Sequence, residues 1–272
     1  MPEEKSDYAL LDRPEVLGAI FHPRGEWGAP SSIDEQAAPR ISVAPNIHIG
    51  TRFHAVAGAK ATILFFHGNG EIAADYDELG PLYNQMGINF LVADFRGYGR
   101  SNGQPTVSAM MSDCHLILSY VRRWLADNRQ PRPLIAMGRS LGSASALELA
   151  AAHPEQMDGL IVESGFAYAE PLLGLLGVNV DGLGFKENQG FGNLDKIRRY
   201  AGPTLIIHAE YDHIIPFGDG QALYEASGAA HKRLLRIEGA NHNDIFARGL
   251  APYMQAVRDL AAHILADQSR PR

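Results

Sequence analysis

Gly-Arg-Ser-Leu-Gly occupies positions 138–142, between two segments of different character. The apolar run 134–137 before it predicts a buried strand, and the alanine-rich run 143–152 after it predicts a helix. A strand, a tight glycine turn and a helix in this order form a nucleophile elbow, where a strained backbone presents a serine hydroxyl. The glycines at both ends leave room for so tight a turn. Ser140 is therefore the candidate nucleophile, and the alternative is that its hydroxyl only caps the helix.

Apolar runs of strand length recur along the chain and alternate with helical patterns. Because unbroken apolar strands are covered on both faces, they predict an α/β fold with a mostly parallel central sheet flanked by helices. Residues 46–56 alternate in polarity and predict a hairpin. The expected strands are 61–66, 88–93, 134–137, 159–162, 204–208 and 234–237, and the expected helices are 80–86, 107–125 with Thr106 as its N-cap, and 251–266.

Length and composition fit one globular domain over residues 1–272. The chain is 46% hydrophobic and 20% charged, which is enough apolar material for a large core. The net charge of −7 and the lack of a basic stripe argue against a nucleic-acid partner. Arg122-Arg123 and Arg198-Arg199 are expected to be solvated helix faces.

The number of cysteines and the composition of the N-terminus indicate where in the cell the protein is expected. Cys114 is the only cysteine, so no disulfide within the chain and no CxxC motif exists, and its helical spacing predicts an inert, buried thiol. The neighbouring Met110 and Met111 are expected in the core. Residues 1–7 are acidic and lack the pattern of a signal peptide, and no apolar run is long enough to span a bilayer. We expect a cytoplasmic protein without stable membrane insertion.

Two loops supply partners for the serine in the chain order Ser, Asp, His. Asp212 follows the expected strand 204–208, and His242 follows the strand 234–237. A serine hydroxyl becomes nucleophilic when an imidazole takes its proton, and a carboxylate fixes the tautomer of that imidazole. Ser140, His242 and Asp212 are thus the predicted catalytic triad.

Other assignments stay open at this stage. Glu210 is the alternative acid, and His213 is the alternative base, although a histidine beside its own acid would reach the serine poorly. His208, Asp212 and His213 have the residue types of a metal site, but nothing else in the sequence completes one.

An oxyanion hole needs backbone N–H groups aimed at the developing charge. Leu141, directly after the nucleophile, supplies one expected donor. Asn69, in the loop 67–70 after the strand 61–66, supplies the other, with Gly70 as the alternative. Because the donors are backbone groups, the side chain of Asn69 need not matter, and His67 is expected to shape the loop.

Six motifs are spread over about residues 60–265: His67-Gly68-Asn69-Gly70-Glu71, the segment 94–103 that begins Asp-Phe-Arg-Gly-Tyr-Gly, the elbow at Ser140, Glu163-Ser164, the Asp212 loop and the His242 loop. In these motifs the chain resembles the α/β-hydrolase superfamily. Within that superfamily it is most similar to cap-poor serine hydrolases, which include the ABHD-type palmitoyl-protein thioesterases and serine aminopeptidase-like proteins. Those thioesterases carry an N-terminal cysteine cluster for lipidation, which is absent here, so we expect no membrane targeting by that route.

The resemblance gives other charged residues mainly structural roles. Asp94, Arg96 and Glu163 match positions that we expect to hold neighbouring loops, with Arg96 as a substrate-carboxylate clamp as the alternative. Arg139 is expected to pack, and the alternatives are contact with substrate or pairing with an acid.

Residues 166–200 fall where this superfamily inserts its cap. Their leucines and phenylalanines predict an apolar acyl pocket with a lid, or else an ordinary helix pair that touches no substrate. The segment contains no cluster of acidic residues that would indicate binding of a substrate's free amino terminus.

The sequence as a whole predicts a serine hydrolase of carboxylic esters or thioesters that needs no cofactor and no metal. The first alternative is an aminopeptidase-like serine peptidase with the same triad, and the second is a non-catalytic binding protein on the same fold. The natural substrate and the oligomeric state are left open.

Overall fold

The computed structural model describes residues 8–26 and 38–269. A seven-stranded sheet with the order β3-β5-β4-β6-β7-β8-β9 forms its centre. The edge strand β3 is antiparallel to β5, and every other pairing is parallel, as the unbroken apolar runs predict. The strands are β3 (Thr51–His54), β4 (Ala61–Phe66), β5 (Ile88–Ala93), β6 (Leu134–Arg139), β7 (Gly159–Glu163), β8 (Thr204–Ala209) and β9 (Lys232–Ile237).

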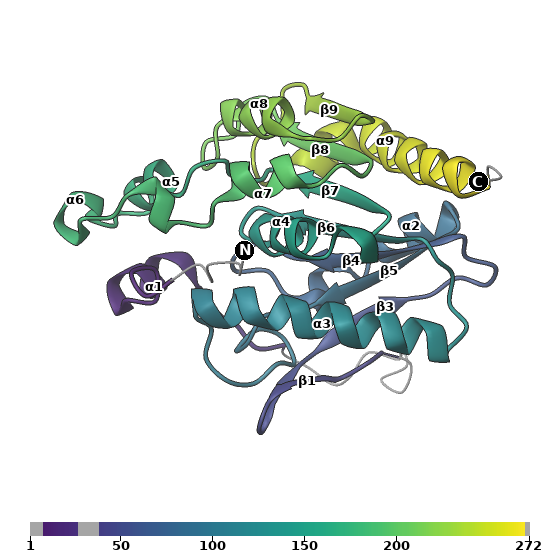
Figure 1. Ribbon diagram of the computed structural model, residues 1–272, viewed down its shortest axis with the longest axis horizontal. Helices are drawn as coiled ribbons and strands as arrows, with labels where there is room; N and C mark the ends of the chain where they lie inside the picture. Colours follow the sequence, from purple (N-terminus) through teal and green to yellow (C-terminus); the bar gives the residue numbers. More distant parts are fainter. Residues whose placement is uncertain (1–7, 27–37, 270–272) are drawn as a thin grey trace.

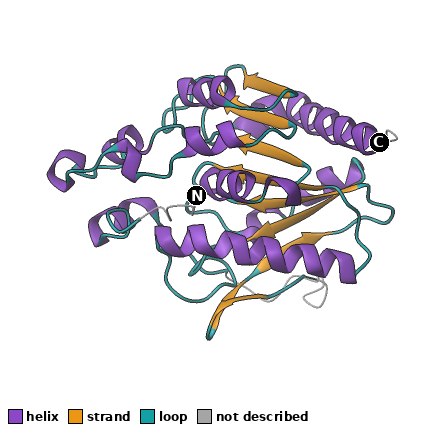
Figure 2. Cartoon of the chain, in the orientation of Figure 1, coloured by secondary structure: helices purple, strands orange, loops and turns teal. Residues whose placement is uncertain are grey.

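Helices cover both faces of the sheet (Figure 1 and Figure 2). One face packs against α3 (Val107–Asp127), α4 (Gly142–Ala152), α7 (Asn193–Arg199) and α8 (Phe217–Ala226), and the other against α2 (Gly80–Gln85) and α9 (Ile245–Gln268). This three-layer arrangement is the one predicted. The remaining helices are α1 (Pro14–Ile20), α5 (Ala169–Leu175), α6 (Val180–Leu183) and short 3₁₀ turns at Ala73–Tyr76, Pro154–Gln156 and Glu187–Gln189.

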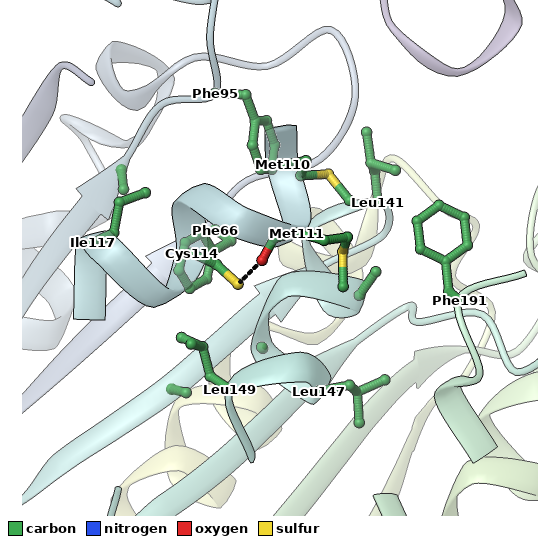
Figure 3. Packing of buried hydrophobic residues seen from close by; sticks show 14 of the residues in the cluster. Phe66, Phe95, Met110, Met111, Cys114, Ile117, Leu141, Leu147, Leu149 and Phe191 are labelled. Atoms are coloured by element: carbon green, nitrogen blue, oxygen red, sulfur yellow. Dashed lines mark hydrogen bonds between the residues drawn. The ribbon is translucent and has the colours of Figure 1, made fainter. Parts of the chain in front are cut away.

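The long helix α3 begins and packs as its sequence predicts. Thr106 caps it, since the Thr106 hydroxyl accepts the Ala109 N–H at 3.0 Å. Met110, Met111 and Cys114 of α3 are buried in the same hydrophobic cluster as Leu147 and Leu149 of α4 (Figure 3). The Cys114 thiol donates to the Met111 carbonyl at 3.1 Å, and burial raises its pKa well above the ordinary value. The thiol is therefore a core group that resists ionisation.

The predicted hairpin over 46–56 is wrong. Strand β2 (Ile47–Ile49) pairs backwards with β1 (Ile41–Ala44), whereas β3 joins the main sheet beside β5. All four residues of β3 are buried, so its burial is satisfied by the large sheet and not by a two-stranded ribbon. The chain passes from one sheet to the other at Gly50, where a Cβ would lie 2.8 Å from the Cβ of Arg100.

The last helix is longer than predicted. It begins at Ile245, and Pro252 lies inside it. The backbone of Gly249 is not helical, so two helical segments meet there and Pro252 falls in the first turn of the second segment. A proline is tolerated at that place because the first N–H groups of a helix need no partner within it.

Residues 1–7, whose composition predicts the absence of a signal peptide, lie outside the described residues. Among residues 8–26 and 38–269, no helix combines the length and the apolar character that crossing a membrane requires. Helices α1, α5 and α6 lie together beyond the carboxyl ends of the parallel strands, at the left of Figure 1.

Candidate active site

Ser140 lies on a sharp turn between β6 and α4. Its φ is 51°, in the left-handed region that a serine adopts only under strain. A Cβ on Gly138 would lie 2.2 Å from the Gly142 carbonyl oxygen, and one on Gly142 would lie 2.2 Å from the Phe66 carbonyl oxygen. The backbone therefore has the elbow geometry, and both glycines are required by close approach.

The structure brings the three predicted triad residues together. His242 Nε2 lies 3.1 Å from Ser140 Oγ, and His242 Nδ1 lies 2.7 Å from Asp212 Oδ2. Asp212 and His242 come from the loops after β8 and β9, at the same sheet edge as the elbow. All three side chains are buried. The arrangement is a continuous hydrogen-bonded chain from a carboxylate through an imidazole to a hydroxyl.

The environment of Asp212 keeps it ionised. Its Oδ1 accepts the N–H groups of Ile214 and Ile215 at 3.0 and 2.8 Å. Burial acts to raise the pKa of Asp212, but His242 and these two N–H groups outweigh it, and the pKa lies below its ordinary value. A carboxylate that stays negative can hold the His242 ring with Nδ1 protonated and Nε2 free to accept from Ser140.

The alternative acid and base lie elsewhere. Glu210 accepts the Gly239 N–H at 2.8 Å and pairs with Arg236 at 3.6 Å. His213 is exposed, and its Nδ1 contacts the side chain of Asn241. Neither is bonded to the Ser140–His242 pair, so the geometry favours Asp212 and His242 over both.

The metal alternative fails on the placement of its ligands. His208 Nε2 donates to the Ile215 carbonyl at 2.8 Å, and burial lowers the pKa of this histidine. No group of three or more His, Cys, Asp or Glu side chains among the described residues is placed to hold a metal ion.

The two expected oxyanion donors lie on elements that meet at Ser140. Leu141 is the N-cap of α4, so the helix directs its positive end toward the serine. Asn69 belongs to the loop after β4, and both residues line the same cavity as Ser140 and His242. His67 is fully buried, and its Nδ1 donates to the Gly68 carbonyl at 2.8 Å, which fits the predicted loop-shaping role.

The side chain of Asn69 has a structural role that the sequence did not reveal. Its Oδ1 accepts the His22 N–H at 2.9 Å and the Tyr98 hydroxyl at 2.8 Å, and its Nδ2 lies 2.7 Å from His22 Nδ1. Three hydrogen bonds thus fix Asn69, which lines the same cavity as Ser140. The sequence suggested only that this side chain need not matter for backbone donation; its contact with His22, 47 positions away, carried no local signal.

Arg96 and Arg139 differ in their partners and in their distance from the serine cavity. Arg96 forms a two-bond ion pair with Asp113 at 2.6 and 2.7 Å and does not line the serine cavity, so the substrate-clamp alternative is not supported. Arg139 lines that cavity and bonds to Glu71 and to Glu163, with Nε of Arg139 3.1 Å from Glu163. The predicted packing role is thus accompanied by pairing with two acids.

A cavity of about 320 Å³ opens over Ser140. The insertion 166–200 supplies one apolar wall, and Ile20 of α1 with His22 after it lines another side, which sequence reasoning missed. Part of the insertion, including Val178 and Phe185, packs into the core and does not line this cavity. The apolar side chains at the cavity are Ile20, Leu141, Phe166, Ala169, Leu172, Leu173, Leu176, Phe191 and Ile214.

Comparison with known sequences points the same way as the geometry. Residues 57–178 match the family described as serine aminopeptidase, S33. The chain is 31% identical to alpha/beta hydrolase domain-containing protein 17B of Homo sapiens over 77% of this chain and 69% of that protein. It is 30% identical to alpha/beta hydrolase domain-containing protein 17C of Xenopus tropicalis over 76% of this chain and 64% of that one.

Solved esterase structures share the fold. The Pyrococcus furiosus esterase Pf2001 superposes with a TM-score of 0.71 at 18% identity, covering 89% of this chain and 99% of the esterase. Est1E of Butyrivibrio proteoclasticus, solved with ferulic acid bound, superposes with a TM-score of 0.69 at 18% identity, covering 84% of this chain and all of Est1E, 100%. At these identities the likeness speaks for the fold alone.

Proposed function

Since the chain belongs to the α/β-hydrolase superfamily, as a relative of the alpha/beta hydrolase domain-containing protein 17 group, we propose that it is a serine hydrolase of apolar acyl esters or thioesters. One observation carries this proposal. The hydrogen-bonded chain Asp212–His242–Ser140 ends at the floor of an apolar cavity, where an acyl carbonyl would meet the serine.

The proposed first half-reaction forms an acyl-enzyme. Ser140 Oγ attacks the carbonyl carbon while His242 Nε2 takes the hydroxyl proton, over the 3.1 Å that separates the two atoms. The carbonyl oxygen becomes an oxyanion and accepts from the N–H groups of Leu141 and Asn69. His242 then gives its proton to the leaving alcohol or thiol, the tetrahedral intermediate collapses, and Ser140 carries the acyl group.

The proposed second half-reaction runs the same steps with water. His242 Nε2 removes a proton from a water molecule, whose oxygen attacks the acyl-enzyme carbonyl. The same two N–H groups receive the second oxyanion. Return of the proton from His242 to Ser140 Oγ releases the carboxylic acid, and Asp212 stabilises the imidazolium in both halves. No further group is needed to balance these steps.

The apolar walls favour an acyl substrate over an aminoacyl one. A protonated amino terminus needs a carboxylate with a free oxygen, and the acid at this cavity is Glu71. Glu71 Oε1 pairs with Arg139, and Glu71 Oε2 accepts the Gly68 N–H and the Tyr76 hydroxyl, both at 2.6 Å. The match to the serine aminopeptidase family keeps peptidase activity as the second candidate, with the same triad.

Hydrolysis rates across a panel of substrates test the proposal. The panel contains p-nitrophenyl esters of increasing acyl length, the matching acyl thioesters and aminoacyl anilides, with Ser140→Ala as the blank. We expect Ser140-dependent cleavage of esters or thioesters and at least tenfold slower cleavage of anilides. Cleavage of anilides alone would establish the peptidase instead. Equal rates for the wild type and Ser140→Ala would refute both and favour a non-catalytic role.

A further inference from the structure

Arg139, the residue before the nucleophile, contacts two other parts of the site at once. Its Nη2 donates to the His242 carbonyl at 2.8 Å, and its Nη1 donates to Glu71 in the loop that carries Asn69. The guanidinium is buried, with its side chain 9% exposed. A single planar group therefore joins the backbone of the elbow, the oxyanion loop and the histidine loop.

The neighbouring strand β7 also holds the side chain of Arg139. Arg139 and Glu163 are paired neighbours at the carboxyl ends of β6 and β7. Arg139 Nε donates to Glu163 Oε1 at 3.1 Å, and Glu163 Oε2 accepts the Tyr253 hydroxyl at 2.7 Å. Glu163 is fully buried, and burial raises its pKa, although Arg139 and Tyr253 act in the other direction. Removing the arginine would leave a buried carboxylate without its cation.

The oxyanion loop is tied to the same group. Glu71 Oε2 accepts the N–H of Gly68, the residue before Asn69, at 2.6 Å, while Glu71 Oε1 meets Arg139. The fit leaves no spare room, since a Cβ on Gly68 would lie 2.8 Å from Arg139 Nη1 and 2.8 Å from Glu71 Oε2. A shift of the guanidinium would therefore move the loop next to the expected oxyanion donor.

We infer that Arg139 is a positioning residue that holds the His242 loop and the oxyanion loop in register with Ser140. The inference rests on the proposed hydrolase function and adds to it a requirement for a planar group with three directed donors. Lysine has one charged nitrogen and cannot span acceptors on three elements in this geometry. The structure thus assigns the arginine of the elbow to the alignment of the machinery.

A matched pair of substitutions tests this role. Arg139→Lys keeps the charge and should lower kcat about 100-fold, because misplacement of reacting groups by about 1 Å costs that much, with KM changed less than about threefold. Arg96→Lys is the control, since Arg96 forms a two-bond ion pair with Asp113 away from the serine cavity. It should leave kcat unchanged. Equal kcat values for Arg139→Lys and the wild type would overturn the inference.

Chemical rescue separates alignment from simple loss of stability. Millimolar ethylguanidinium should raise the kcat of Arg139→Ala at least tenfold above its value without the additive. Ethylammonium should leave that kcat unchanged. Rescue by both cations alike would overturn the requirement for a planar donor group. If Arg139→Ala does not fold, Glu71→Gln replaces it, and it should lower kcat at least tenfold; an unchanged kcat there would also overturn the inference.

The wild type serves as the reference for the proposed function itself. If it shows no Ser140-dependent turnover, the hydrolase proposal has failed and the arginine variants are not informative. If it turns over and Arg139→Lys does so equally, only the positioning role has failed. The two failures are therefore distinguishable in one series of measurements.

Discussion

The nucleophile elbow and the insertion 166–200 both line the cavity, yet they are built differently. Around the elbow, α4 is buried along its first turns, and the glycines at 138 and 142 approach other backbone to distances that allow no added atom. In the insertion, Leu175 and Leu176 of the α5 region are 59% and 37% exposed, and a Cβ added at Gly174 would meet no other element within 4 Å. The elbow thus sits in close packing, while the insertion side of the cavity has room to change. Substitutions should therefore act on rate at the elbow side and on selectivity at the insertion.

The largest expected effect falls on the carboxylate behind His242. Asp212→Asn should lower kcat by about 10⁴-fold, as the corresponding change does in a serine protease, because an amide favours the wrong imidazole tautomer. The measurement is kcat on the best ester of the panel. Glu210→Gln is the control and should stay within about twofold, since Glu210 bonds to Gly239 and not to His242. Loss of activity in Glu210→Gln with a normal Asp212→Asn would reverse the assignment of the acid.

The second prediction compares the free energy of unfolding after substitution of one glycine in the elbow and one in the insertion. In Gly142→Ala the new Cβ would lie 2.2 Å from the Phe66 carbonyl oxygen, so the free energy of unfolding should fall by about 1–3 kcal/mol. In Gly174→Ala nothing lies within 4 Å, and alanine in helix α5 should raise it by up to about 1 kcal/mol.

Urea unfolding measures both glycine variants. Similar destabilisation by the two would contradict the contrast in packing between the elbow and the insertion. The kcat of Gly174→Ala should match that of the wild type, because no part of the triad or of the oxyanion loop touches this position.

A third prediction concerns selectivity. Leu172 lines the cavity, and Leu175 on the same helix does not. Leu172→Trp should fill part of the acyl space and lower kcat/KM for long acyl esters at least tenfold, while acetate esters change less than about threefold. Leu175→Trp, on the exposed side of α5, should leave the chain-length profile unchanged. A profile that shifts equally in both variants would mean that the insertion does not form the acyl wall.

The smallest effect is expected where the two regions are joined. Glu148 on α4 pairs with Lys196 on α7 at 2.7 Å and with His115 at 3.2 Å. Burial acts to raise the pKa of Glu148, but His115 and Lys196 lower it from 4.5 to about 2. A carboxylate with a depressed pKa stabilises the fold above its unfolded pKa, and that stability is lost as the pH falls through the folded value.

The variant Glu148→Gln isolates this contribution. It should lower the free energy of unfolding by about 1 kcal/mol above pH 4.5, and the difference from the wild type should shrink as the pH falls from 4.5 toward 2. Unfolding curves at several pH values measure it. A difference that grows with acidity would contradict the sign of the linkage.

Local patterns predict the sheet and the elbow well. Each expected strand is present to within two residues at its ends, because unbroken apolar runs between turns leave few other structures. The elbow, the Asp212 loop and the His242 loop follow directly from strand ends, since parallel strands finish at one edge. The hairpin over 46–56 was mispredicted because alternation indicates a strand but not its partner.

The supporting contacts of the site could not be predicted from local patterns. Arg139 reaches Glu71 across 68 positions and His242 across 103, and Asn69 reaches His22 across 47. Such pairs depend on how separate elements meet in space, and no periodicity records them. The contribution of Ile20 on α1 to the cavity was missed for the same reason. The contacts of α1 with α5 join segments that are far apart in the sequence.

Covalent labelling can show whether Ser140 is a nucleophile and whether His242 activates it. The wild type is incubated with a fluorophosphonate, and intact and peptide masses are recorded beside Ser140→Ala and His242→Ala. We expect one adduct per chain, located on Ser140, with no label in Ser140→Ala and slow labelling in His242→Ala. A folded wild type that stays unlabelled, or a label that persists in Ser140→Ala, would contradict this expectation.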